Sequence, residues 1–386
     1  MLRAFAVLAI GVAAPVHPRP LDAQTAPDAA PTFELDATWP KPLPDNWMFG
    51  AIWGAAVDSS DHIWVIHNPK GGWPMGDNTV GEIKAAGKQP APPVVEFDFD
   101  GNALRGWGGH GAGYNWPQVS NAAYPYGTPA EHAIFVDYQD NVWVAGNGYV
   151  ALKFSPAGKF LLQIGELWKT NGSNDTRLLG NPTDLAVDAK TNEVYIADGY
   201  VNHRVIVFDA TTGRYKRHWG AYGQKPFDGP IVKDDPNPDD NLVPDSSSSL
   251  VPGKWPLPQW WLPVHCVRVS NDGLVYVCDR QHSRVQVFQR NGTFVREAVL
   301  PASGLGSASG AAFSHDPQQR LLYVCGGGKI WILNRADLRI LGSFDSAGNH
   351  YIDVDSKGNI YTNGGRGADG QRRPQRYLLK STIDRR

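Results

Sequence analysis

The sequence lacks a strong charge of either sign, long apolar runs and extended helical periodicity, and each shortage excludes a class of protein. Its 36 basic and 38 acidic side chains leave a net charge of −2, so nothing indicates a nucleic-acid or membrane-surface partner. Beyond the first residues, no segment is long and apolar enough to cross a bilayer. We therefore expect neither a membrane-spanning protein nor a helical one.

The amino terminus is the one place with a continuous apolar run. The stretch MLRAFAVLAIGVAAP has one positive charge followed by a short apolar segment, which is too short to span a bilayer and is typical of a secretory signal. We predict a signal peptide at residues 1–24, a linker at 25–32, and a secreted or periplasmic product. An N-terminal strand or a disordered leader is the alternative interpretation.

Cysteine is also scarce, with only Cys266, Cys278 and Cys325. An odd number in an exported chain leaves at least one free thiol. Cys278 in VYVCD and Cys325 in LYVCG occupy matching places in two repeats, and such places are usually too far apart for a disulfide. We therefore interpret all three as small buried side chains and predict no disulfide framework.

Turn-forming and aromatic residues are abundant, with 42 glycines, 30 prolines and 14 each of Trp, Tyr and Phe. The pattern V-D-x-x-(D/N/G)-x-(I/V)-(W/Y)-(V/I) recurs from residues 57, 136, 187, 269 and 354, with a weaker copy at 315. A third apolar run follows each copy, and a fourth follows most. Four short antiparallel strands per repeat, six times over, predict an all-β, six-bladed β-propeller as a single domain over residues 33–386.

The last repeat supplies only three strands before the sequence ends. We expect the segment 33–39 to complete that blade and to close the ring, which removes an open sheet edge. Two connections, 107–131 and 219–263, are much longer than the others, and long loops in a compact domain are usually functional or disordered. Tandem β-hairpins in a sandwich are the alternative to a propeller.

One position in the repeat is filled by histidine in every second copy. The residue four places before the leading Val or its equivalent is, in chain order, Trp53, His132, Thr183, His265, Ala311 and His350. Because the first strand of a propeller blade lines the central channel, we expect the three imidazoles to converge near its axis. Three nitrogen ligands with a fourth position open are typical of catalytic zinc.

We predict Zn²⁺ bound by His132, His265 and His350, although imidazole also suits other divalent transition metals such as iron, copper or nickel. The alternative is a trio of histidines bonded to water without a metal. The loops between second and third strands lie on the same face, so Tyr200 and Arg280 are candidate catalytic residues. Tyrosinate near a cation is a competent base, and arginine binds a carboxylate through two parallel bonds. Alternatively, Tyr200 packs on a neighbouring blade and Arg280 pairs with Asp279 or another acid.

These motifs resemble those of NHL-repeat propellers, and among them the catalytic core of the peptidyl-α-hydroxyglycine α-amidating lyases, over about residues 33–380. The resemblance implies a six-bladed propeller whose zinc is held by three histidines from alternate blades. It also implies cleavage of a C-terminal α-hydroxyglycine into a peptide amide and glyoxylate. His132, His265 and His350 match the family's zinc ligands, Tyr200 its catalytic tyrosine and Arg280 its active-site arginine.

The sequence departs from that family at two places. The family has a second arginine in a His-Arg pair at the end of the second strand of blade one, where this chain has His67-Asn68, so one substrate anchor is predicted to be absent. The family's third histidine is followed by an Asp that helps to bind a structural calcium. Tyr351 follows His350 here, which argues against that calcium.

The sequence therefore favours an exported, metal-dependent lyase that breaks a carbinolamide C–N bond in a peptide or small-molecule substrate and works as a monomer. A zinc hydrolase such as a lactonase would need the same metal with water as nucleophile. A non-enzymatic propeller would instead bind a peptide or glycan on a tryptophan-rich rim around Trp255, Trp260 and Trp261.

Overall fold

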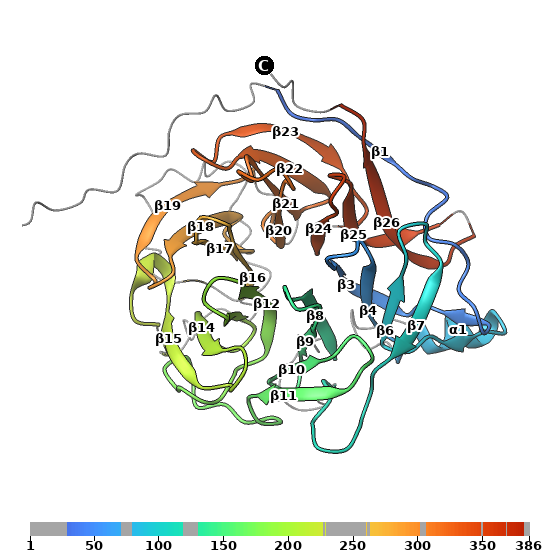
Figure 1. Cartoon of the computed structure of the whole chain (residues 1–386), viewed down its shortest axis with the longest axis horizontal. Coiled ribbons are helices and arrows are strands. Elements are labelled where there is room, and N and C mark those ends of the chain that lie inside the picture. Colours follow the sequence, from blue (N-terminus) through green and yellow to red (C-terminus); the bar gives the residue numbers. More distant parts are fainter. Residues whose placement is uncertain are drawn as a thin grey trace, which may run out of the picture.

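A computed structural model describes residues 29–70, 79–118, 130–226, 228, 260, 263–301, 306–348, 350–367 and 369–381. Within these ranges the chain forms six four-stranded sheets and one two-stranded sheet. The six larger sheets are arranged as blades around a central axis, and the first strand of each blade lies nearest the centre (Figure 1). The predicted six-bladed β-propeller is therefore confirmed.

The first three blades follow one another directly along the chain. Blade one holds β3 (Ala51–Val57), β4 (Ile63–Asn68), β6 (Val94–Phe97) and β7 (Ala103–Trp107). Blade two holds β8 (Glu131–Val136), β9 (Val142–Gly146), β10 (Val150–Phe154) and β11 (Phe160–Ile164). Blade three holds β12 (Pro182–Asp188), β13 (Glu193–Asp198), β14 (Arg204–Asp209) and β15 (Tyr215–Trp219).

The last three blades complete the ring. Blade four holds β16 (Val264–Val269), β17 (Leu274–Asp279), β18 (Arg284–Gln289) and β19 (Phe294–Val299). Blade five holds β20 (Gly310–Phe313), β21 (Leu321–Gly326), β22 (Lys329–Asn334) and β23 (Ile340–Asp345). Blade six holds β24 (Ile352–Val354), β25 (Ile360–Arg366), β26 (Arg372–Leu379) and, at its outer edge, β1 (Phe33–Leu35).

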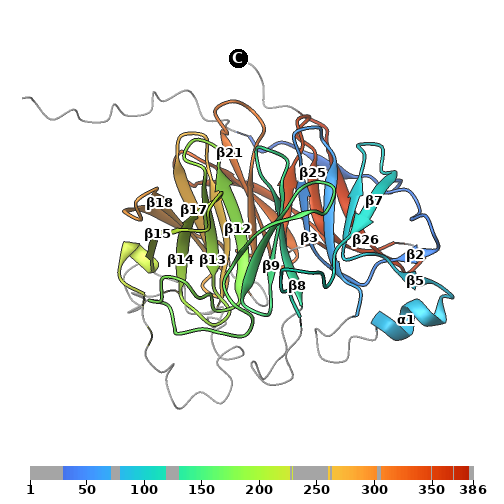
Figure 2. The ribbon, with the colours of Figure 1, turned by 60° about the horizontal axis from the view of Figure 1, so that its bottom comes forward.

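The ring closes through its two ends. Strand β1 pairs antiparallel with β26, with Phe33 opposite Leu379 and Leu35 opposite Tyr377. This covers the outer edge of β26, which would otherwise expose unpaired backbone groups. Outside the blades lie the short parallel pair β2 (Trp47–Met48) and β5 (Gln89–Pro90), the 3₁₀ turn η1 (Ala221–Gly223) and helix α1 (Thr79–Ala85). Helix α1 lies beyond the outer edge of blade one, far from the channel (Figure 2). Within the described ranges no helix combines the length and apolarity needed to cross a bilayer.

The recurring Asp of the repeat motif shapes the turn between the first two strands of a blade. In blade two, Asp137 Oδ1 accepts hydrogen bonds from the backbone N–H groups of Gln139 and Asn141, and Oδ2 accepts one from Trp143 Nε1. Asp58 does the same for Trp64 in blade one. One carboxylate thus caps the turn and satisfies the polar atom of a buried tryptophan, whose ring fills the core between blades.

The prediction of three unpaired cysteines was wrong for two of them. Cys266 and Cys278 form a disulfide, while Cys325 is a buried free thiol. Cys266 in β16 lies directly opposite Cys278 in β17, with their Cα atoms 4.8 Å apart. The tight turn after Val269 sets this register, so the bridge joins neighbouring strands of one hairpin instead of equivalent positions in two blades.

The proposed chain divisions remain predictions. The signal peptide at 1–24 lies outside the described residues, and the linker at 25–32 is described only from residue 29. The two long connections are described only at 107–118 and 130–131 and at 219–226, 228, 260 and 263.

Candidate metal centre

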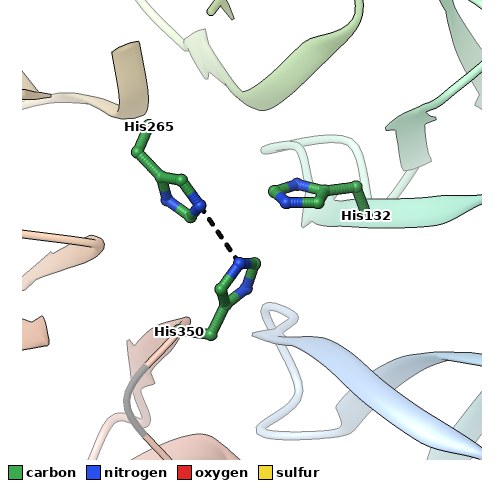
Figure 3. Close-up of side chains that lie close together, drawn as sticks. All are labelled: His132, His265 and His350. Carbon is green, nitrogen blue, oxygen red and sulfur yellow. Dashed lines mark hydrogen bonds between the residues drawn. The ribbon is translucent and has the colours of Figure 1, made fainter. Parts of the chain in front are cut away.

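Three histidines stand where alternate blades enter the channel. His132 lies in β8, His265 in β16, and His350 just before β24. All three side chains point into the space between the blades (Figure 3). The structure therefore brings together the three residues that the sequence predicts as metal ligands.

A β-bulge aims two of these histidines. The pairing between β8 and β9 skips His132, and the pairing between β16 and β17 skips His265. Trp53 and Thr183 are skipped in the same way in blades one and three. The extra residue of a bulge leaves the regular alternation of the strand and re-aims its side chain. The repeat thus directs the side chain at this position toward the channel, and the residue type at this position decides which chemical group faces the channel.

The spacing of the three imidazoles suits a single cation. The Nε2 atoms of His265 and His350 are 3.1 Å apart. The ring centroid of His132 lies 5.2 Å from that of His265 and 4.7 Å from that of His350. One nitrogen from each residue falls within 4.8 Å of the others. Nitrogen ligands of tetrahedral zinc lie about 3.3 Å apart for Zn–N bonds of about 2.0–2.1 Å, so only small side-chain movements separate this arrangement from coordination.

Each imidazole is held from behind by a backbone carbonyl of the next blade around the ring. The Nδ1 atom is the bonded atom every time, in the pairs His132 with Thr183 O at 2.7 Å, His265 with Ser309 O at 2.6 Å, and His350 with Trp53 O at 3.2 Å. Because a carbonyl oxygen only accepts, Nδ1 carries the proton and Nε2 keeps its lone pair. Bonds of this kind fix the tautomer and orientation of metal-binding histidines.

The electrostatics of the site keep the imidazoles neutral. Burial lowers the pKa of His132 to about 3 and, with the charges of neighbouring groups, lowers the pKa values of His265 and His350 well below 6.5. The positive charge of Arg280 acts in the same direction on all three pKa values. Neutral imidazole is the form that binds a metal, so these ligands need no proton release near pH 7.

Tyr200 lies beside the three histidines. It follows the end of β13, is 8% exposed, and its phenol oxygen is 3.0 Å from Nε2 of His132. Because Nδ1 of His132 holds the proton, the phenol donates to Nε2. Its oxygen therefore lies next to the nitrogen that faces the axis, within reach of any group bound there.

Arg280 follows β17 and lies over Tyr200, with its guanidinium carbon 5.9 Å from the centroid of the phenol ring. Within the described part of the chain, no carboxylate pairs with it, and its buried Nε has no hydrogen-bond partner. The neighbouring Asp279 is bound instead by His282 and Arg284, at 2.7 and 2.8 Å. The alternative in which Asp279 neutralises Arg280 is therefore wrong, and the guanidinium remains available for an anion.

Tyr351 also belongs to the site, although the sequence pattern marked it only as the position where the family's calcium-binding Asp is absent. It is fully buried, its phenol donates to the carbonyl of Thr183, and it lies 3.2 Å from Nδ1 of His132. Burial, and then the charge of Asp184, raise the pKa of Tyr351 well above 10. Calcium prefers a shell of carboxylate and carbonyl oxygens, whereas here a neutral phenol stands beside Arg268, which pairs with Asp184. These side chains do not fit calcium, and its absence stays a prediction.

In the His67-Asn68 pair at the end of β4, the histidine has a structural role. His67 is fully buried, accepts the backbone N–H of Gly50 on Nδ1 at 3.0 Å, and donates from Nε2 to the carbonyl of Pro92 at 2.9 Å. Burial lowers its pKa to about 4. A neutral imidazole with both nitrogens bonded cannot also bind a substrate.

The alternative of a tryptophan-rich binding rim is not supported at the one of its three residues that the structure describes. Trp260 is 1% exposed and donates from Nε1 to Gln286 at 2.7 Å, so it belongs to the core between blades. Trp255 and Trp261 lie outside the described residues.

Residues 179–208 and 264–288, which cover parts of blades three and four, match the NHL repeat. The fold and these matches define the chain as a six-bladed β-propeller that carries NHL repeats. It is related at modest identity to the amidating lyases. Peptidyl-alpha-hydroxyglycine alpha-amidating lyase 2 of Drosophila melanogaster is 30% identical over 190 residues, which are 47% of this chain and 41% of that protein.

Other relatives have lower identity over a larger share of this chain. Peptidyl-glycine alpha-amidating monooxygenase A of Xenopus laevis is 23% identical over 271 residues, 69% of this chain and 24% of that protein. Human NHL repeat-containing protein 3 is 24% identical over 269 residues, 67% of this chain and 57% of that protein. The chain thus spans less than half of the lyase and monooxygenase that it matches. A streptogramin B lyase structure aligns over 91% of this chain and 89% of its own, with a TM-score of 0.49 and 12% identity.

Proposed function

We propose that this protein is an exported, metal-dependent lyase of the amidating-lyase type. It would cleave the C–N bond of a peptidyl-α-hydroxyglycine, or of a related carbinolamide, and release glyoxylate or the corresponding carbonyl compound. The observation that supports this most is the set of three neutral histidines whose Nε2 atoms face one point beside Tyr200 and Arg280.

Zn²⁺ is the proposed metal, and His132, His265 and His350 would hold it. Three imidazole nitrogens leave room for a further ligand, as in catalytic zinc sites, and the carbonyl bonds behind them pre-orient the donors. When bound, the cation supplies Lewis acidity toward a substrate oxygen. Iron, copper and nickel also accept imidazole ligands, so metal identity is part of the proposal.

Arg280 would hold the substrate. Its guanidinium has no carboxylate partner among the described residues, so it can bind the carboxylate of a hydroxyglycine through two parallel hydrogen bonds. The predicted loss of the family's second arginine, at Asn68, leaves Arg280 as the main anchor. This arrangement favours substrates with one terminal carboxylate close to the carbon that reacts.

Tyr200 would move the proton. As a phenolate it takes the proton of the substrate hydroxyl, and the O–H electron pair forms the new C=O bond. The C–N bond breaks with its electron pair going to the amide nitrogen, which takes up the proton that the phenol of Tyr200 now carries, so the products are an amide and an aldehyde acid. Arg280 lies over this ring, so its positive charge stands close to the group that would accept the proton.

We also propose that the protein is exported to a secreted or periplasmic location, because residues 1–24 have the pattern of a signal peptide. The proposed partners are a peptide or small-molecule substrate, with no nucleic acid or membrane, and the proposed state is a monomer.

The activity is tested with purified, zinc-loaded protein and a peptide that ends in α-hydroxyglycine. The proposal expects glyoxylate and the peptide amide in equal amounts, above the spontaneous rate. No glyoxylate from protein whose metal content has been verified would reject the lyase activity. Hydrolysis of esters or lactones by the same preparation would then assign the centre to a metal hydrolase.

A further inference from the structure

The disulfide joins two segments that carry residues of the candidate metal centre. Cys266 is the residue that follows His265 in β16, and Cys278 stands two residues before Arg280, near the end of β17. Both cysteines are fully buried. One covalent bond therefore joins the segment that carries a predicted metal ligand to the segment that carries the predicted carboxylate anchor.

The pairing of the two strands places this bond at the edge of the bulge. Val264 pairs with Asp279 and Cys266 pairs with Cys278, so His265 is the extra residue between two consecutive pairs. A bulge interrupts the regular ladder of hydrogen bonds at the residue that it re-aims. The disulfide fixes the first pair beyond that interruption, with the two Cα atoms 4.8 Å apart.

The three histidines differ in what supports them. His132 has the phenol of Tyr351 against its Nδ1, and the backbone N–H of His350 donates to Asn363 Oδ1 at 2.9 Å. Within the described part of the chain, and apart from contacts with the other site residues, the imidazole of His265 is supported by the carbonyl of Ser309. In blade four the pair that follows the bulge is the disulfide, whereas in blade two the corresponding pair is Ala133 and Ala145.

We propose that the Cys266–Cys278 disulfide is a positioning element of the metal centre, which holds the bulge so that His265 faces the axis and fixes the distance from His265 to Arg280. This inference rests on the metal centre proposed above. Loss of groups that orient metal ligands typically weakens metal binding 10- to 100-fold, and we expect an effect of that size here.

The test compares full-length wild-type protein with Cys266→Ala/Cys278→Ala and with Cys325→Ala. The third cysteine is a matched control because it is also fully buried and lies in β21 of the adjacent blade, but forms no disulfide. Co²⁺ is the probe, since its visible absorption reports the geometry of the ligands. We expect the double variant to bind Co²⁺ at least about 10-fold more weakly and with a changed spectrum, while Cys325→Ala matches the wild type.

A merely stabilising disulfide gives a different result. The double variant would then lose thermal stability but keep the Co²⁺ dissociation constant and spectrum of the wild type, and this outcome would overturn the inference. If the double variant does not fold, the same titration is carried out on wild-type protein reduced with a phosphine, freed of the reagent under nitrogen, and later reoxidised. Weaker binding that recovers on reoxidation supports the inference, and unchanged binding overturns it. Wild-type protein that binds no Co²⁺ would reject the proposed metal centre itself.

Discussion

The Nδ1 atom of His132 lies 2.7 Å from the carbonyl oxygen of Thr183, the residue at the equivalent bulge of the next blade. The same contact recurs from His265 to Ser309 and from His350 to Trp53. Bulges in blades two and four thus aim His132 and His265, and each of the three histidines finds in the next blade the backbone acceptor that fixes its tautomer. The site is a consequence of the symmetry of the fold, with histidine placed in every second blade.

Replacement of Tyr200 by Phe should abolish proton transfer while leaving the metal in place. Only the phenol oxygen is lost, and it lies beside His132 without being one of the three ligands. We expect kcat to fall by about 10²- to 10⁴-fold, the usual contribution of a positioned acid or base. Metal content should stay at the wild-type level. Full activity of Tyr200→Phe in a glyoxylate assay would remove this tyrosine from the mechanism.

Replacement of Arg280 by Lys should mainly weaken substrate binding. Lysine keeps the positive charge but not the planar fork that binds a carboxylate through two bonds. We expect KM to rise by about tenfold or more, with a smaller change in kcat. Arg296, on β19 at the outer edge of blade four, serves as a control for loss of an arginine. An unchanged KM with a substrate that has a free carboxylate would contradict the assignment.

The stability of the fold should depend on pH through His67. Its folded-state pKa of about 4 lies below the ordinary 6.5, so the unfolded chain takes up a proton first as the pH falls. The stabilisation is complete above pH 6.5 and is lost toward pH 4, with a loss of about 2 kcal/mol between pH 7 and pH 5. The free energy of unfolding of His67→Gln should therefore change less between these pH values than that of the wild type.

The three channel histidines act in the same direction, so the comparison between wild type and variant isolates the part due to His67. The exposed His110 provides the matched control His110→Gln, which removes an imidazole at the surface instead of in the core. Parallel curves for wild type and His67→Gln, measured by urea unfolding, would show that the buried imidazole does not titrate as described.

The sequence alone predicted the propeller because turn residues and alternating apolar positions recur in each repeat. It predicted the metal ligands because one aligned position holds histidine in alternate copies. It missed the Cys266–Cys278 bond because equivalent positions in different blades were compared, whereas the partners face each other within one hairpin. The acceptors behind the imidazoles are backbone carbonyls, which any residue supplies, so no sequence pattern marks them. Trp260 was taken for a rim residue because burial between blades depends on packing, which composition does not reveal.

The metal content of the wild-type protein and of His265→Ala tests the central claim most directly. After both proteins are loaded with zinc and freed of excess metal, the account predicts about one ion per wild-type chain and little in the variant, which should lose one of three ligands while keeping its circular dichroism spectrum. Wild-type protein without stoichiometric metal, or a variant that retains the full amount, would contradict it.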